Sequence, residues 1–475
     1  MIRNYRGITL VVLVVTIIIL LILAGITIAT LTGDNGLLTK AGESKNASQI
    51  SNEKEKIELA IIQAISENKY GEITVSELQK QIGDNIAKVE EIRKKIFVTM
   101  TGSKNQYKID ENGEVIEYKY VEPSIMLDGE KFNSKIGEDR SKIINVYVID
   151  NLNIPQNTYK IFDDISKKGD GSVKAWMIEN HDTSGYYDLY IGANGGVISN
   201  NCVHLFLSFT ECKTMDLKNL YTDNAQSMIE VFRYCYKLQK LDLRSFDTKN
   251  VTSMERMFQY CYDLSEINLS NFSTLNVKDM QRMFNGCKNL SKLDLRNFQT
   301  DNVTNMTAMF LDCEKIKELN LNNFNTSNVT NMASMFYGCK NVEKIYIDNF
   351  NTEKVTDMSG MFYNCKNLKA LNLSSFNTDK VTNMYYMFRD CNNIKTIDLS
   401  NANTSLVTNM ERMFQRCNNI TVLNILKFDM HNVNNYEYIL NGINNNVVIK
   451  TNLNTKVILK DSNTNLSDNN FELVN

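Results

Sequence analysis

Apolar residues recur through the middle of the chain with a fixed period of 26 residues. One copy, beginning at Val251, has apolar residues at relative positions 0, 3, 6, 7 and 10, and then alternates apolar and polar residues around Ile267 and Leu269. The first spacing predicts a short helix with one inward face, and the alternation predicts a strand. The polar link over residues 273–276 predicts a turn that leads into the next copy.

The same columns recur in successive copies, and each column keeps one kind of side chain. Phenylalanine and methionine columns fill the first half of each copy, while leucine or isoleucine fills both inward strand positions. A repeat of this length is one supersecondary unit that buries its apolar face against its neighbours. The period therefore predicts an α/β solenoid, a leucine-rich-repeat-like stack of 26-residue helix–strand coils over residues 205–433. The clearest column is made of cysteines: Cys235, Cys261, Cys287, Cys313, Cys339, Cys365, Cys391 and Cys417.

These cysteines are predicted to be buried free thiols. A small apolar thiol suits the corner between the inward phenylalanine and the inward leucine of each copy. Equivalent side chains of neighbouring coils point the same way, so their sulfur atoms do not face one another as a disulfide requires. Metal binding is not expected, because the chain has no Cys-x-x-Cys pair and contains three histidines.

The amino-terminal segment predicts a membrane span. Arg3 and Arg6 precede 24 uncharged residues, 8–31, which are long enough to cross a bilayer. The upstream arginines favour a cytoplasmic amino terminus, with the rest of the chain outside. We therefore expect a protein that is anchored in the cytoplasmic membrane and displayed on the cell surface, with an extracellular carboxy-terminal region. A cleaved secretory signal is less favoured, since the apolar stretch is too long.

The remaining segments predict smaller modules around the repeats. Helical spacing at 53–67 and 75–95, followed by a hairpin signal at 111–114, predicts a small α/β module. A strand-rich stretch is expected to cap the amino-terminal end of the repeats, because a bare end exposes core side chains. The expected division is 1–7 leader, 8–32 membrane helix, 33–120 stem and α/β module, 121–204 cap, 205–433 repeats and 434–475 closing cap.

The repeat motif carries a resemblance to a known family. The run Met-Phe-x-x-Cys-x-x-Leu-x-x-Leu-x-Leu, with Phe-x-Thr-x-x-Val-Thr-x-Met between copies, resembles the BspA-like leucine-rich repeats of bacterial surface proteins. The resemblance implies a surface-displayed binding protein, often an adhesin, and it implies no catalytic residues. The partner it implies is a protein or cell-surface ligand.

The first residues carry a second resemblance, to the type IV prepilin amino terminus. Arg6-Gly7-Ile8-Thr9-Leu10 stands before the apolar stretch. In that family a peptidase cuts after the glycine, here Gly7, and the new first residue, here Ile8, is methylated. Val12 stands where the family has the glutamate that aligns subunits in a filament. Pilus-like self-association and a plain signal anchor both stay open as alternatives.

Composition and motifs do not predict an enzyme. The net charge of −3 shows no excess of basic residues of the kind that nucleic-acid binding requires. The three histidines fall in no motif, and no nucleophile elbow, phosphate loop or zinc-protease motif is present. We therefore expect a binding protein without a cofactor. A filament subunit that displays the repeats is the alternative, and an exported enzyme is the least favoured hypothesis.

The outward strand positions form the candidate ligand face. Tyr346 interrupts a row of aspartates and asparagines, and Arg244 and Arg296 occupy the next outward position in earlier copies. An aromatic residue near arginines is a usual composition for the core of an interface. The alternative is that this face is only exposed to solvent and binds no ligand. The row consists of Asp242, Asn268, Asp294, Asn320, Tyr346, Asn372, Asp398 and Asn424.

Overall fold

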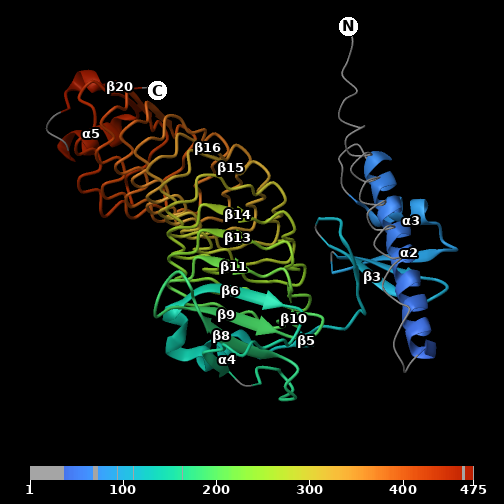
Figure 1. The fold of residues 1–475 in the computed structure, drawn as a ribbon. Helices are drawn as coiled ribbons and strands as arrows, with labels where there is room; N and C mark the ends of the chain where they lie inside the picture. The colour runs from blue at the N-terminus through green and yellow to red at the C-terminus, as the bar shows by residue number, and fades with distance from the viewer. Residues whose placement is uncertain are drawn as a thin grey trace, which may run out of the picture. The chain divides into compact units, whose positions relative to one another are not determined.

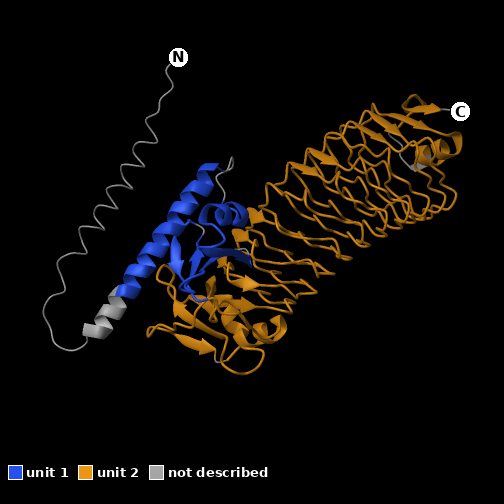
Figure 2. Ribbon diagram, turned by 90° about the vertical axis from the view of Figure 1, so that its right-hand side faces the viewer, with its two compact units in different colours: residues 1–119 blue, residues 120–475 orange. Residues whose placement is uncertain are grey.

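The computed structural model describes residues 37–67, 73–93, 95–110, 112–162, 164–462 and 466–473. The chain divides into two compact units, residues 1–119 and residues 120–475 (Figure 2). Each unit has a hydrophobic core of its own.

The described part of the first unit combines two helices with a four-stranded antiparallel sheet. Its core joins Ile57 and Ile61 of the long helix to Val98 and Tyr107 of the sheet. The strands are hydrogen-bonded in their sequence order. The elements are α2 (Leu37–Glu67), α3 (Val75–Ile82), β1 (Ala87–Ile92), β2 (Lys95–Met100), β3 (Gln106–Ile109) and β4 (Val115–Glu117).

The helix predicted over residues 75–95 is only partly correct. The α3 helix begins where the Thr74 hydroxyl accepts a hydrogen bond from the backbone N–H of Glu77, and it ends at Ile82. Gly83 follows with φ +86°, a left-handed conformation that terminates a helix. The chain then forms β1, which pairs with β2. The hairpin predicted at 111–114 is confirmed by the antiparallel pairing of β3 and β4.

The expected membrane anchor needs correction. Among the residues that the structure describes, no helix combines the length and the apolar character needed to cross a bilayer. The predicted span over 8–31, together with Gly7 and Ile8, lies outside the described residues. Anchoring through a helix, and the cell-surface location inferred from it, are therefore not supported.

The second unit begins with a mixed sheet that continues into the first repeats. Its strand order is β14-β13-β11-β6-β9-β8-β7, and a smaller sheet has the order β12-β10-β5 (Figure 1). The parallel pairing of β6 with β11 joins the segment before the repeats to the repeats themselves. These elements are β5 (Ser124–Ile125), α4 (Gly129–Ile136), η1 (Gly137–Lys142), β6 (Ile143–Ile149), β7 (Lys160–Phe162), β8 (Lys174–Glu179), β9 (Tyr187–Gly192), β10 (Val197–Ile198), β11 (Thr214–Asp216) and β12 (Leu220–Tyr221).

The repeats contribute short strands that pair in parallel with the equivalent strand one repeat further on. Leu241 faces Ile267, for example, and Leu319 faces Ile345. The strands belong to several separate sheets, because some repeats do not form a strand at the equivalent residues. The elements are β13 (Lys240–Asp242), β14 (Glu266–Asn268), β15 (Glu318–Asn320), β16 (Lys344–Tyr346), β17 (Thr396–Asp398), β18 (Val422–Asn424), β19 (Val448–Thr451), α5 (Leu453–Ser462), η2 (Asp468–Asn470) and β20 (Phe471–Leu473).

The predicted helix of each repeat does not form. Two residues per repeat, four positions apart, have positive φ; in one copy they are Arg256 (+52°) and Tyr260 (+64°). A right-handed helix excludes that conformation. The backbone N–H groups bond instead to the next repeat, as Phe258 does to the carbonyl of Met283 at 2.9 Å. The predicted α/β solenoid of helix–strand coils is therefore wrong: the described repeats contain turns and short strands in separate sheets, without a helix.

Equivalent side chains of successive repeats stack in the core. The phenylalanine column runs from Phe206 to Phe414, with ring centroids 5.3–5.8 Å apart and ring planes within 18° of parallel. Each thiol of the cysteine column donates to the carbonyl of a phenylalanine 29 residues earlier, as Cys339 does to Phe310 at 3.2 Å. All ten cysteines are free and buried, so the prediction of buried free thiols is confirmed.

A buried threonine column supports the turn between repeats. The Thr326 hydroxyl donates to the carbonyl of Asn351 at 2.9 Å and accepts a hydrogen bond from the N–H of the same residue at 2.8 Å. Equivalent threonines repeat the donor contact from Thr222 to Thr404. The polar link predicts a turn, and the structure shows in addition that the threonine of this link is buried.

Candidate binding face

The outward aspartates and asparagines have a local structural role. At Asp294, Asn320, Asn372 and Asp398 the side-chain oxygen accepts a hydrogen bond from the backbone N–H two residues later, at 2.9–3.1 Å. This contact is an Asx turn, in which a short polar side chain replaces a backbone hydrogen-bond acceptor. These four residues therefore start the turns that follow them, and their side chains are also exposed.

Tyr346 has no side-chain acceptor for such a turn, and the preceding repeat supplies one. The backbone N–H of Asp348 donates to Oδ1 of Asn322 at 3.0 Å. The Asp348 carboxylate accepts hydrogen bonds from Asn372 at 2.6 Å and from Asn322 at 3.2 Å. The hydrogen bond from Asn372 contributes most to lowering the pKa of Asp348. Three successive repeats are thus joined by amide–carboxylate contacts beside the half-buried Tyr346.

Two arginines of the outward face form forked ion pairs with aspartates two residues earlier. The Arg244 Nη2 atom lies 2.7 Å from Asp242, and the Arg296 Nη2 atom lies 2.6 Å from Asp294. Partial burial opposes ionisation of Asp242, but the hydrogen bonds from Arg244 still lower its pKa. The hydrogen bonds from Arg296 lower the pKa of Asp294. Both carboxylates are therefore charged at neutral pH.

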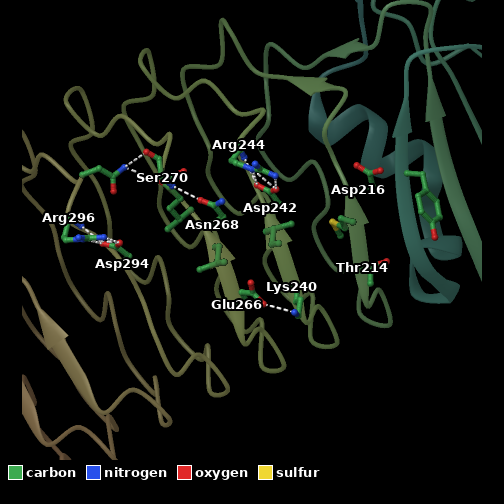
Figure 3. A pocket seen from close by; sticks show the side chains of 16 residues that line it. Thr214, Asp216, Lys240, Asp242, Arg244, Glu266, Asn268, Ser270, Asp294 and Arg296 are labelled. Atoms are coloured by element: carbon green, nitrogen blue, oxygen red, sulfur yellow. Dashed lines mark hydrogen bonds and ion pairs between the residues drawn. The ribbon is translucent and has the colours of Figure 1, made fainter. Parts of the chain in front are cut away.

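An open groove of about 1030 Å³ lies across this face. It extends from Tyr147 on β6 over β11, β13 and β14 to Asn297 of the following repeat (Figure 3). Within it, Lys240 and Glu266 form an ion pair between neighbouring strands at 2.7 Å. Both forked pairs also line the groove. It therefore combines fixed charges from several repeats with an aromatic side chain at one end.

An aromatic row borders this end of the groove. The ring of Tyr147 stacks on Tyr190 at 5.0 Å, and Tyr190 stacks on Trp176 at 5.8 Å. Burial raises the pKa of Tyr147 and of Tyr190, so both hydroxyl groups stay protonated at neutral pH. Of these three side chains, Tyr147 is the one that lines the groove.

The structure places the predicted face residues in three parts of the outward face, of which the second and third are joined by the hydrogen bond from Asn372 to Asp348. Asp294 and Arg296 line the groove. Asn320 and Tyr346 face each other across the β15–β16 pair. Asn372 and Asp398 line a cavity of about 120 Å³ between two later repeats. Binding by these residues stays a prediction.

Sequence reasoning missed several residues that line the groove. Lys240 and Glu266 belong to a column that alternates in charge, continuing with Lys292, Glu318 and Lys344. That alternation was a usable signal for ion pairs between neighbouring repeats. Thr214 and Asp216 stand one period of 26 residues before Lys240 and Asp242, so the same columns could have identified them. Tyr147 comes from β6, outside the repeats, and no repeat signal marks it.

The described residues contain no group of three or more histidine, cysteine, aspartate or glutamate side chains placed to hold a metal ion. His204 lies between two carboxylates, 3.2 Å from Glu130 and 3.3 Å from Glu230. It does not line the groove.

Taken together, the stacked columns define a repeat protein. The family model described as "Mycoplasma protein of unknown function, DUF285" matches residues 200–318, 263–346 and 339–452, which together make up more than half of the chain. The chain belongs to this family. A search of curated proteins and a search of solved structures each find no match. The family match agrees with the surface-repeat part of the BspA-like resemblance, and it gives no evidence of leucine-rich repeats or of a pilin.

Proposed function

We propose that this protein is a non-catalytic binding protein that recognises a protein partner through the exposed strand face of its repeats. The observation that carries the proposal is the open groove over β11, β13 and β14. Successive repeats place equivalent side chains side by side there. A partner then contacts several repeats at once without entering a closed pocket.

The side chains of the groove suit recognition better than catalysis. Asp242 and Asp294 are held ionised by arginines, whereas a general base or acid needs a pKa near the working pH. The hydrogen bond to Glu266 raises the pKa of Lys240, so that amine keeps its proton. Fixed charges of both signs beside an aromatic ring match the arginine and tyrosine enrichment of protein interfaces.

A peptide-display selection tests this function. Random peptides are selected on the intact protein, with counter-selection on the double variant Arg244→Ser, Arg296→Ser. Serine fits this column, because Ser270 and Ser374 occupy the equivalent position in other repeats. Enriched peptides are expected to bind the double variant at least about tenfold more weakly, the usual scale of a lost hot spot. Enriched peptides that bind both proteins equally well contradict the proposal.

The alternative from the sequence is a filament subunit that displays the repeats. No contact among the described residues specifically favours it.

A further inference from the structure

A second surface of alternating tyrosine and arginine side chains lies on the turn half of the later repeats. The Arg389 guanidinium is 5.2 Å from the ring centroid of Tyr363 and 4.4 Å from that of Tyr386. The Arg412 guanidinium is 5.5 Å from Tyr386 and 5.1 Å from Tyr438. These five side chains, which we call the Tyr–Arg stack, come from four successive repeats.

The repeat fold does not require these large side chains. Tyr386, Arg412 and Tyr438 occupy one column. Earlier repeats fill that column with the large residues Glu230, Arg256 and Arg282, and the repeats between fill it with Ala308, Ser334 and Gly360, so the fold accepts small residues there. All members of the column have positive φ, which lies between 54° and 59° at the three residues of the stack. A bulky residue is disfavoured in this conformation, whereas glycine adopts it freely. Large side chains in a strained position point to a role outside packing.

The arginines of the stack are held in place and still have donors to offer. Arg412 lies 2.9 Å from Glu411 and also donates to the Tyr386 hydroxyl. The Nε atom of Arg389 lies 3.3 Å from Asp390, while among the described residues no hydrogen bond reaches its Nη1 or Nη2.

The exposed Arg416 also shares Asp390, at 3.6 Å. Three guanidinium groups therefore pair with two carboxylates, Asp390 and Glu411. Aromatic stacking orients a guanidinium fork, and such a fork binds a carboxylate with two parallel hydrogen bonds.

We propose that the Tyr–Arg stack is a docking surface for an acidic segment of a protein partner. Carboxylates of the segment bind the free edges of Arg389 and Arg412, and its apolar or aromatic side chains lie on the tyrosine rings. Tyrosine and arginine are the residue types enriched at binding hot spots. The stack shares no residue with the groove, whose lining ends at Asn297, so this surface is independent of the function proposed above.

Fluorescence anisotropy with the intact protein tests the proposal. The probe is a labelled random copolymer of glutamate and tyrosine, and a copolymer of lysine and tyrosine is the matched control. The double variant Arg389→Gln, Arg412→Ser removes both guanidinium groups. It places in each column a residue already found there, as at Gln415 and Ser334.

The acidic copolymer is expected to bind the unmodified protein, and about tenfold more weakly the double variant. It should bind the groove variant Arg244→Ser, Arg296→Ser as it binds the unmodified protein. If the double variant does not fold, Arg412→Lys keeps the charge but loses the planar fork, and it should weaken binding several-fold. Equal binding to the folded variant and the unmodified protein overturns the proposal. Equally strong binding of the lysine copolymer, or no binding of the acidic one, also overturns it.

Discussion

Replacement of Thr326 by valine isolates the hydrogen bonds that join one repeat to the next. Thr326 is 1% exposed, and its hydroxyl is both donor and acceptor to the backbone of Asn351. Valine has nearly the same shape but makes neither bond, so packing changes little. Each lost bond costs about 0.5–1.5 kcal/mol net, which gives about 1–3 kcal/mol for the pair.

Urea unfolding followed by the fluorescence of Trp176 measures this cost. Trp176 is the one tryptophan of the chain and is buried in the same unit. Thr330→Val is the matched control: Thr330 lies four residues after Thr326 and is exposed, and its hydroxyl donates a longer bond of 3.2 Å to Thr304. The control should change the free energy of unfolding by less than about 0.5 kcal/mol.

A third variant separates the hydroxyl from the methyl group. Thr326→Ser keeps both hydrogen bonds and removes one methyl group, at a cost of about 0.8 kcal/mol. The order of destabilisation should therefore be valine at 326, then serine at 326, then valine at 330. If Thr326→Val lowers the free energy of unfolding no more than Thr330→Val does, the hydrogen bonds of the threonine column do not join the repeats.

Three further predictions concern groups buried in either unit. Tyr107→Phe removes the hydrogen bond of 2.7 Å to the buried Glu53 carboxylate and should destabilise the first unit by about 1.5–3 kcal/mol, measured by circular dichroism of its helices. Cys339 should react with a thiol reagent only after unfolding, because burial raises its pKa to about 12 and excludes the reagent; rapid labelling of the native protein contradicts this. The ordinary pKa of a thiol, which the unfolded chain has, is 9.0, so below that pH the thiol is protonated in both states and the folded state keeps its full stability. Between pH 9.0 and about 12 the thiol ionises in the unfolded chain only, and this stability is lost. The free energy of unfolding should thus fall above pH 9.0 by up to about 1.4 kcal/mol per pH unit for each such thiol, and a flat alkaline profile argues against the shift.

The inward columns could be predicted from the sequence because burial against neighbouring repeats admits only apolar types. Leu243 and Leu269 were assigned to the inward strand face, and both are buried. The helix could not be excluded by the same pattern. Spacing of 3, 3, 1 and 3 residues fits one helical face and equally fits the successive turns that the structure contains.

The sequence contains one indication that the repeat does not form a helix, but only some residues of the column show it. The column of Tyr260 includes Gly286, Asp312, Gly338 and Asn364, residue types that tolerate a left-handed backbone. Other copies have tyrosine in this column, and tyrosine does not indicate a left-handed backbone. The groove could be predicted only at its repeat end, because its other end is formed by β6, and no sequence period predicts the pairing of β6 with the repeats.

Hydrogen–deuterium exchange of the intact protein, alone and with a peptide selected on it, tests the binding face most directly. Bound peptide should slow exchange at the turns that follow β13 and β14, residues 243–245 and 269–271, and at 295–297 in the next repeat. Slowed exchange at all three turns supports recognition through the groove. Unchanged exchange at these turns, with slowed exchange elsewhere, such as at residues 385–441, contradicts recognition through the groove.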